Sequence, residues 1–130
     1  MAFDTLTKGA KTPGQFVAKL LHSATQAHIS HLITSSYAAH KNLNEYYDAI
    51  PGLADEFAEA YQGKYGKITG YGIGVGISEA NDVKSYITYF KELHTYVEEY
   101  RATLKDSDLQ NITDEILALI KSTLYKFSLS

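Results

Sequence analysis

Side chains that could bind a metal ion are concentrated in one stretch of the chain, between residues 28 and 59. They are imidazoles and carboxylates: His28, His31, His40, Asp48, Asp55, Glu56 and Glu59. Together these groups form the nitrogen and oxygen ligand set that suits iron, zinc or manganese. Because the sequence contains no cysteine, any metal must be held by such residues. This stretch is therefore where we expect a divalent-metal site.

The spacing of these residues allows both a functional and a structural interpretation. Asp55 and Glu59 are four positions apart, so on a helix they are neighbours on one face. His28 and His31 are three positions apart and fall on or beside an apolar stripe. A histidine on an apolar face is more often a hydrogen-bonded core residue than a ligand, and a group of carboxylates is more often a solvated helix face.

The order and spacing of four of these residues resemble a known ligand pattern. His28, His40, Asp55 and Glu59 are separated by 12, 15 and 4 positions. This spacing is similar to that of the metal ligands in the Dps-type ferritin-like proteins, and the run from Asp55 to Glu59 resembles that family's D-x-x-A-E signature. In a second alignment the segment 31–34 resembles the family's H-W-N-V motif, which makes His31 the first ligand in place of His28.

The resemblance implies a ferritin-like four-helix bundle that assembles as a closed homo-oligomer. Its metal site would lie between two subunits, with histidines of one facing Asp and Glu of the other. The metal would be iron, with zinc or manganese as alternatives, and the activity would be oxidation of Fe(II) by peroxide or oxygen. Stretches such as SYAAHKNLNEYYD also look similar to small phage-encoded relatives, which would place the protein in a host cytoplasm.

The chain departs from the Dps pattern at three places. The family's middle aspartate is Asn44 here, and Asp48, one turn later, is a candidate substitute. The family's tryptophan is Leu32, and the basic tail with which many members bind DNA is reduced to Lys8 and Lys11. Loss of a carboxylate weakens a second metal ion first, so we expect metal binding to outlast oxidation activity. With a net charge of −3, we expect weak DNA binding or none.

The composition is typical of one globular domain, which we assign to residues 1–130. Hydrophobic residues make up 45% of the chain and charged residues 21%, which argues against disorder. The N-terminus does not resemble a signal peptide and no apolar stretch is long enough to span a membrane, so we expect a cytoplasmic protein. Eleven tyrosines without a tryptophan suit half-buried positions and interfaces, which favours self-association.

Hydrophobic periodicity predicts four helices. After a loose arm at 1–11, the segment 12–15 (Thr-Pro-Gly-Gln) is typical of a helix start. Periodicity alone would let this first helix run on to about residue 41, but we favour a break within 33–36, with Ser35 or Ser36 capping the second helix. We expect the second helix to kink or break at Pro51 and to stop at Gly63. The third should run unbroken from about residue 80 to 104, and the fourth should begin at a capping box formed by 107–110. The apolar stripe of the first helix is predicted to be Val17, Leu20, Leu21, Ala24, His28, His31 and Leu32.

A segment rich in glycine and tyrosine, residues 63–77, separates the second and third predicted helices. One interpretation is a long crossover that is pressed against helix backbones. The other is a ligand-binding loop, for which the candidate contacts are Tyr65, Tyr71, Gly72 and Gly74. The glycine spacing fits neither a Walker loop nor a dinucleotide-binding fingerprint.

These observations lead to two functional hypotheses for an all-α, ferritin-like four-helix bundle with a crossover between its second and third helices. The first is a homo-oligomer that binds divalent metal through His28 or His31, His40, Asp55 and Glu59, with ferroxidase-like activity left open. The alternative is a non-enzymatic phage-type protein that sequesters a small ligand, or binds a host protein, through its tyrosine- and glycine-rich surface. A pocket lined by residues 63–77 away from the histidines would favour the alternative.

Overall fold

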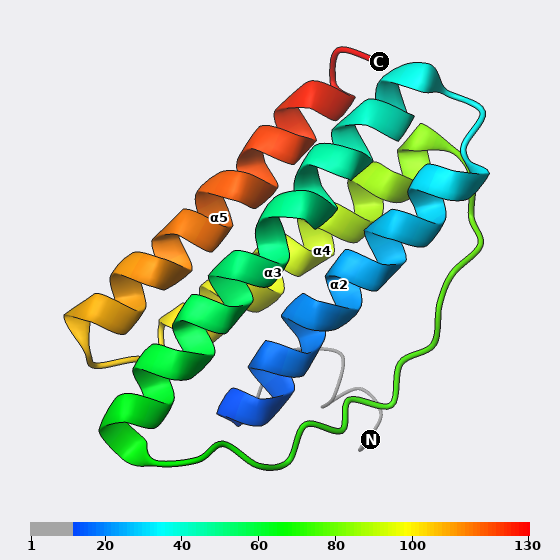
Figure 1. Ribbon diagram of the computed structural model, residues 1–130. Helices are drawn as coiled ribbons and strands as arrows, with labels where there is room; N and C mark the ends of the chain where they lie inside the picture. The colour runs from blue at the N-terminus through cyan, green and yellow to red at the C-terminus, as the bar shows by residue number, and fades with distance from the viewer. Residues whose placement is uncertain (1–11) are drawn as a thin grey trace.

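The computed structural model describes residues 12–130, and these form four α-helices and no strand. The helices are α2 (Pro13–Ile33), α3 (Tyr37–Tyr65), α4 (Val83–Arg101) and α5 (Ser107–Phe127) (Figure 1). The prediction of an all-α domain with four helices is confirmed. The predicted arm at residues 1–11 lies outside the described residues. No helix within residues 12–130 is long and apolar enough to cross a membrane.

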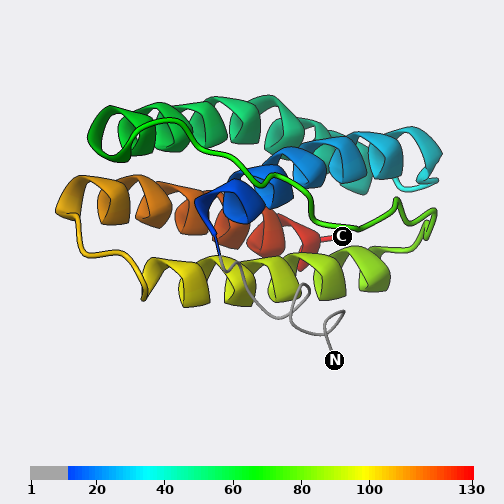
Figure 2. The same cartoon turned by 90° about the horizontal axis from the view of Figure 1, so that it is seen from below.

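The four helices pack side by side as a bundle. α2 packs on α3, α3 on α5, and α5 on α4. α3 and α4 run in one direction along the bundle, whereas α2 and α5 run in the other (Figure 1). Two parallel helices cannot be joined by a short turn, so residues 66–82, here called the strap, run the length of the bundle from the end of α3 to the start of α4 (Figures 1 and 2).

Aromatic side chains from all four helices fill the core. Phe16 stacks on Tyr100, with ring centroids 4.1 Å apart, and meets the edge of Phe57 at 4.9 Å. At the other end of the core, Phe90 lies 4.8 Å from Tyr46 and 5.8 Å from Phe127. Burial of rings of this size supplies much of the hydrophobic free energy of a small domain.

The predicted start of the first helix and its predicted break are both confirmed. The Thr12 hydroxyl accepts a hydrogen bond from the backbone N–H of Gln15 at 3.1 Å, and Pro13 occupies the first helical position. α2 ends at Ile33, and the Ser36 hydroxyl caps α3 by accepting from the N–H of Ala39 at 3.1 Å. Serine competes for backbone hydrogen bonds inside a helix but satisfies free N–H groups at its start, which explains the break.

The predicted interruption at Pro51 and the predicted stop at Gly63 are both wrong. α3 is continuous through Pro51, and it passes Gly63 to end at Tyr65 with Gly66 as its C-cap. Proline removes one backbone hydrogen bond, but buried residues on both sides of it, such as Ile50 and Ala54, hold the helix together by packing. Gly66 has φ of 87°, a conformation that glycine adopts readily, so it and not Gly63 terminates the helix.

The ends of the third and fourth helices also differ from prediction. α4 begins at Val83, capped by the Asp82 carboxylate, and ends at Arg101, short of the predicted residue 104. α5 begins at Ser107 with Asp106 as its N-cap, and Asp106 makes no side-chain capping hydrogen bond, so the predicted capping box at 107–110 does not form. Instead, Asp106 accepts a hydrogen bond from the Tyr65 hydroxyl, which joins the end of α3 to the start of α5.

The apolar stripe predicted for the first helix is partly wrong. Leu21 and Leu32 are 46% and 65% exposed, and His28 is also exposed. The buried face of α2 is formed by polar as well as apolar residues, among them Phe16, Val17, Leu20, Ser23, Gln26, Ala27, Ser30 and His31. A buried serine or glutamine is compatible with a core when it is hydrogen-bonded, which periodicity of apolar residues does not reveal.

Candidate functional site

Three of the candidate histidines gather where α2 ends and α3 begins. The rings of His31 and His40 stack with centroids 3.7 Å apart. His28 stacks on Tyr47 of α3 at 4.1 Å, and its ring lies 5.9 Å from that of His31. The α2–α3 turn thus brings together imidazoles that are up to 12 positions apart in the sequence.

Reciprocal hydrogen bonds set the tautomers of the stacked pair. Nδ1 of His31 lies 2.8 Å from the backbone oxygen of His40, and Nδ1 of His40 lies 2.9 Å from the backbone oxygen of His31. A carbonyl oxygen only accepts, so each Nδ1 carries the proton and donates it. The Nε2 atom of each neutral ring is then left with its lone pair, which is the form in which imidazole binds a metal.

Asn44 and Asp48, the two uncertain ligand candidates, extend this cluster along α3. The hydroxyl of Tyr47 donates to Oδ1 of Asn44 at 2.7 Å, and Nδ2 of Asn44 donates to Oδ2 of Asp48 at 2.7 Å. Asn44 therefore links the ring on which His28 stacks to the Asp48 carboxylate. We refer to His28, His31, His40, Tyr47, Asn44 and Asp48 as the imidazole cluster.

The carboxylates Asp55 and Glu59 form a second, separate group on α3. Both are exposed, and the pKa of Glu59 is raised because Asp55 hydrogen-bonds to it and adds negative charge beside it. Neither forms a salt bridge with a basic side chain of residues 12–130. Two adjacent carboxylates without a cation repel each other, and a proton or a metal ion relieves that repulsion.

Within one chain, the imidazole cluster and the Asp55–Glu59 pair lie too far apart to bind the same metal ion. Asp55 is eight positions beyond Tyr47 on the same helix, which corresponds to about 12 Å at 1.5 Å per residue. Within residues 12–130, no three His, Asp or Glu side chains are arranged to hold a metal ion. The structure thus places His31 beside His40 and Asp55 beside Glu59, and it leaves the pairs apart.

The four loop candidates do not share one pocket. Tyr65 lies at the end of α3 in a hollow beside Tyr61 and Tyr100, whereas Tyr71 lies on the strap and lines a groove with Asp55 and Glu59. Gly72 and Gly74 are exposed. Four later residues of the strap, Val75, Gly76, Ser78 and Ala80, line two further cavities, which like the groove at Tyr71 include no histidine of the imidazole cluster.

Sequence reasoning missed the residues that meet this part of the strap. Gln26 of α2 forms two hydrogen bonds with the backbone of Ser78. Its Nε2 donates to the backbone oxygen of Ser78 at 2.9 Å, and its Oε1 accepts from the backbone N–H of Ser78 at 2.8 Å. His22, one turn earlier, donates from Nε2 to the backbone oxygen of Gly76 at 2.7 Å. The available signal was a glutamine on the core side of an amphipathic helix, since buried amides require partners.

Comparison with known proteins identifies a family but no characterised relative. No curated protein and no solved structure matches the chain. The likeness to Dps-type proteins therefore stays an expectation based on its motifs. The family model DUF5856, described as a family of unknown function, matches residues 31–127, which include three of the four helices and the strap. The chain therefore belongs to DUF5856, a family of unknown function.

Proposed function

We propose that this protein is a homo-oligomer that binds a divalent metal, iron foremost, at sites completed by two copies of the chain. The imidazole cluster would supply one half of each site, and the Asp55–Glu59 pair of the second copy would supply the other half. The observation that carries the proposal is that both groups lie along the α2–α3 side of the bundle but too far apart to share a metal within one chain.

The surface between the two groups favours pairing with a copy of itself. Leu21 is 46% exposed and lies in a groove with Pro51 and Gly52, both of which are also exposed. An apolar centre with imidazoles on one side and carboxylates on the other is self-complementary under a two-fold rotation. Such a rotation would set His28 of one copy opposite Asp55 and Glu59 of the other.

The ligand chemistry favours His28 and His40 over His31. His28 is exposed, whereas His31 is 9% exposed, and the His31 ring stacks on that of His40 and lies at an interplanar angle of 66° to that of His28. Asp48 adds a carboxylate on the imidazole side, although Asn44 already donates a hydrogen bond to it. One strong carboxylate pair suits one tightly held ion, so binding is the primary function proposed, and oxidation of Fe(II) as a substrate would need a second ion held more weakly.

The up-down-down-up order of the helices, with a strap joining two parallel ones, also fits a ferritin-like bundle (Figure 1). Fold alone does not determine function, so the proposal depends on the two ligand groups and not on the topology.

Metal titration of the protein with Asp55→Asn and Glu59→Gln tests the site. We expect the parent to bind Fe(II) or Zn(II) and this double variant to lose at least about tenfold in affinity, because a metal prefers ionised carboxylates to amides. A matched control is Glu99→Gln with Glu115→Gln, which removes the same charge from exposed positions on α4 and α5. Equal affinities for all three proteins would refute the site.

The shared geometry is tested separately by Gly52→Arg. A side chain at Gly52 meets no atom within 4 Å inside one chain, so the fold should tolerate it, whereas a second copy packed there would be pushed away. Gly63→Arg is the control, because Gly63 is equally open on the same helix. We expect Gly52→Arg alone to sediment as a monomer and to lose metal affinity. A monomeric parent that binds metal fully would contradict the two-copy site.

A further inference from the structure

A cavity of about 260 Å³, here called the strap cavity, lies between α2, α4 and the strap. The strap forms one side of it, since Val75, Gly76 and Ser78 all line the cavity. Hydrogen bonds from His22 to Gly76 and between Gln26 and Ser78 tie the strap to α2 at this place. The position of this part of the chain relative to its neighbours is therefore fixed by contacts with α2.

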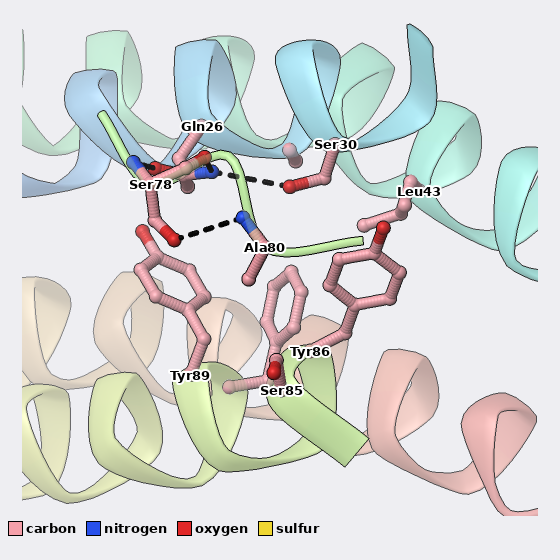
Figure 3. Close-up of a pocket in the computed structure, with 10 residues that line it drawn as sticks. Gln26, Ser30, Leu43, Ser78, Ala80, Ser85, Tyr86 and Tyr89 are labelled. Atoms are coloured by element: carbon pink, nitrogen blue, oxygen red, sulfur yellow. Dashed lines mark hydrogen bonds between the residues drawn. The ribbon is translucent and has the colours of Figure 1, made fainter. Parts of the chain in front are cut away.

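The side chain of Lys19 runs from α2 to two tyrosine rings of α4 in the wall of the strap cavity. Its Nζ lies 5.9 Å from the centroid of the Tyr89 ring and 5.7 Å from that of the Tyr96 ring. Tyr89 rises from α4 toward the strap (Figure 3). Lys19 and both rings line the cavity, so the ammonium group that lies over these rings is at the cavity wall. Cation–π contacts at such distances stabilise a cation only modestly.

This ammonium group has no ion-pair or hydrogen-bond partner among residues 12–130. Burial lowers the pKa of Lys19, and the negative charge of Glu92, which lines the same cavity, opposes only part of that shift. Nζ of Lys19 is not enclosed as the partnerless hydroxyl of Tyr89 is, so a ligand can reach it. A partly desolvated cation that is accessible and lacks a partner favours an anion beside it.

The other walls of the strap cavity restrict which anion fits. Leu93, which is 2% exposed, and Val75 supply apolar surface beside the tyrosine rings. Glu92 is exposed and would repel a second negative charge on a ligand. At about 30 Å³ for each water-sized group, the cavity has room for roughly nine of them. A small monocarboxylate with a short apolar chain satisfies these three conditions.

We propose that the strap cavity is a binding site for a small aliphatic monocarboxylate. The carboxylate would pair with the Lys19 ammonium group, and the apolar chain would lie against Leu93 and Val75. Charge-assisted hydrogen bonds of this kind are about twice as strong as neutral ones, so they would replace the hydration that Lys19 has lost. The site shares no residue with the imidazole cluster or the Asp55–Glu59 pair, so it is independent of the proposed metal site.

The test uses hexanoate as the probe and hexanamide as its neutral counterpart, with the full-length protein and NMR of its tyrosine rings. We expect hexanoate to shift the Tyr89 and Tyr96 signals with a Kd on the order of 1 mM, as is usual for a ligand of so few atoms. Hexanamide should bind at least about tenfold more weakly, because it forms no ion pair with Lys19. Equal affinities for the two probes, or no shift of either ring signal with hexanoate, would overturn the proposal.

The variant Lys19→Met keeps an apolar chain against the tyrosine rings and removes the charge, so the bundle should fold. We expect it to lose at least about tenfold in hexanoate affinity, whereas Lys19→Arg, which retains the charge, should keep most of it. Lys121→Met removes the same charge from an exposed position on α5 and is the matched control. Equal hexanoate affinities for Lys19→Met and the parent would show that Lys19 only packs on the rings, and the proposal would be refuted.

Discussion

Gly14, at the start of α2, offers a sharp test of how the strap is held. A Cβ atom added there would lie 2.3 Å from the backbone oxygen of Thr69 and 2.8 Å from that of Gly70. Carbon atoms essentially never approach backbone atoms closer than 3.0 Å, so in Gly14→Ala the strap must move by about 0.7 Å, the difference between 3.0 and 2.3 Å. The obstructing atoms are backbone, so no side chain can rotate out of the way.

The expected cost follows from two opposing effects. Overpacking of this kind costs about 1–3 kcal/mol. Replacing glycine by alanine inside a helix stabilises the folded protein by up to about 1 kcal/mol, and by less near a helix end such as this one. We therefore expect Gly14→Ala to lower the free energy of unfolding by about 1–2 kcal/mol, which for a chain of this length lowers Tm by about 3–8 °C.

Gly63→Ala is the matched control. It is the same substitution in a helix, but a Cβ at Gly63 meets no atom within 4 Å. Because Gly63 also lies near a helix end, Gly63→Ala should raise the free energy of unfolding by up to about 0.5 kcal/mol, less than in a helix interior. Urea denaturation measures both changes, and limited proteolysis reports whether the strap at 66–82 is cut faster in Gly14→Ala. If both substitutions stabilise the protein, the contact between the strap and α2 is refuted.

Three further predictions concern the helices and their connections. Tyr46→Phe should destabilise by about 1–2 kcal/mol in urea denaturation, because the fully buried Tyr46 hydroxyl bonds to that of Ser23 at 2.7 Å. The Ser23 hydroxyl would keep its bond to the backbone oxygen of Leu20 and lose only the bond from Tyr46; an unchanged midpoint would contradict this. Ser36→Ala should cost about 1 kcal/mol by removing the cap of α3, and no loss of thermal stability would show that the cap is dispensable. The pKa of Asp108 is lowered, chiefly by its hydrogen bond from Lys64, so this contact stabilises the fold above the ordinary value of 3.8 and is lost as pH falls through the lower, folded-state pKa. The stability difference between the parent and Lys64→Met should therefore shrink below pH 3.8, and a difference that grows there would refute the assignment.

Local signals in the sequence predicted the helices well because they act over a few residues. The cap at Thr12 and the break before Ser36 depend on side chains that bond to backbone groups two or three positions away. The seam of the third helix, including Phe90 and Val97, is buried as its spacing of three and four positions predicts. Where local signals were misleading, as at Pro51, packing on both sides of the residue was stronger than the local preference.

The candidate metal ligands show which contacts residue spacing can predict and which it cannot. Their residue types and their order along the chain predicted a nitrogen and oxygen ligand set, and the helical period correctly placed Asp55 beside Glu59. The stacking of His31 on His40 depends on how α2 turns into α3, which no periodicity within either helix describes. In the proposed function a second copy of the chain would bring the two groups together, so the metal site stays a prediction.

The sequence by itself determined the helical class, the approximate helix ranges and the neighbours within each helix, because these follow from hydrogen bonds and side-chain periods over a few residues. Only the tertiary structure decided which residues from different helices meet. It turned Leu21 outward and anchored the strap by the bonds of Gln26 to Ser78. Such contacts join positions more than 50 apart, and they form because the bundle must cover its apolar faces all at once, a condition that no short stretch of sequence contains.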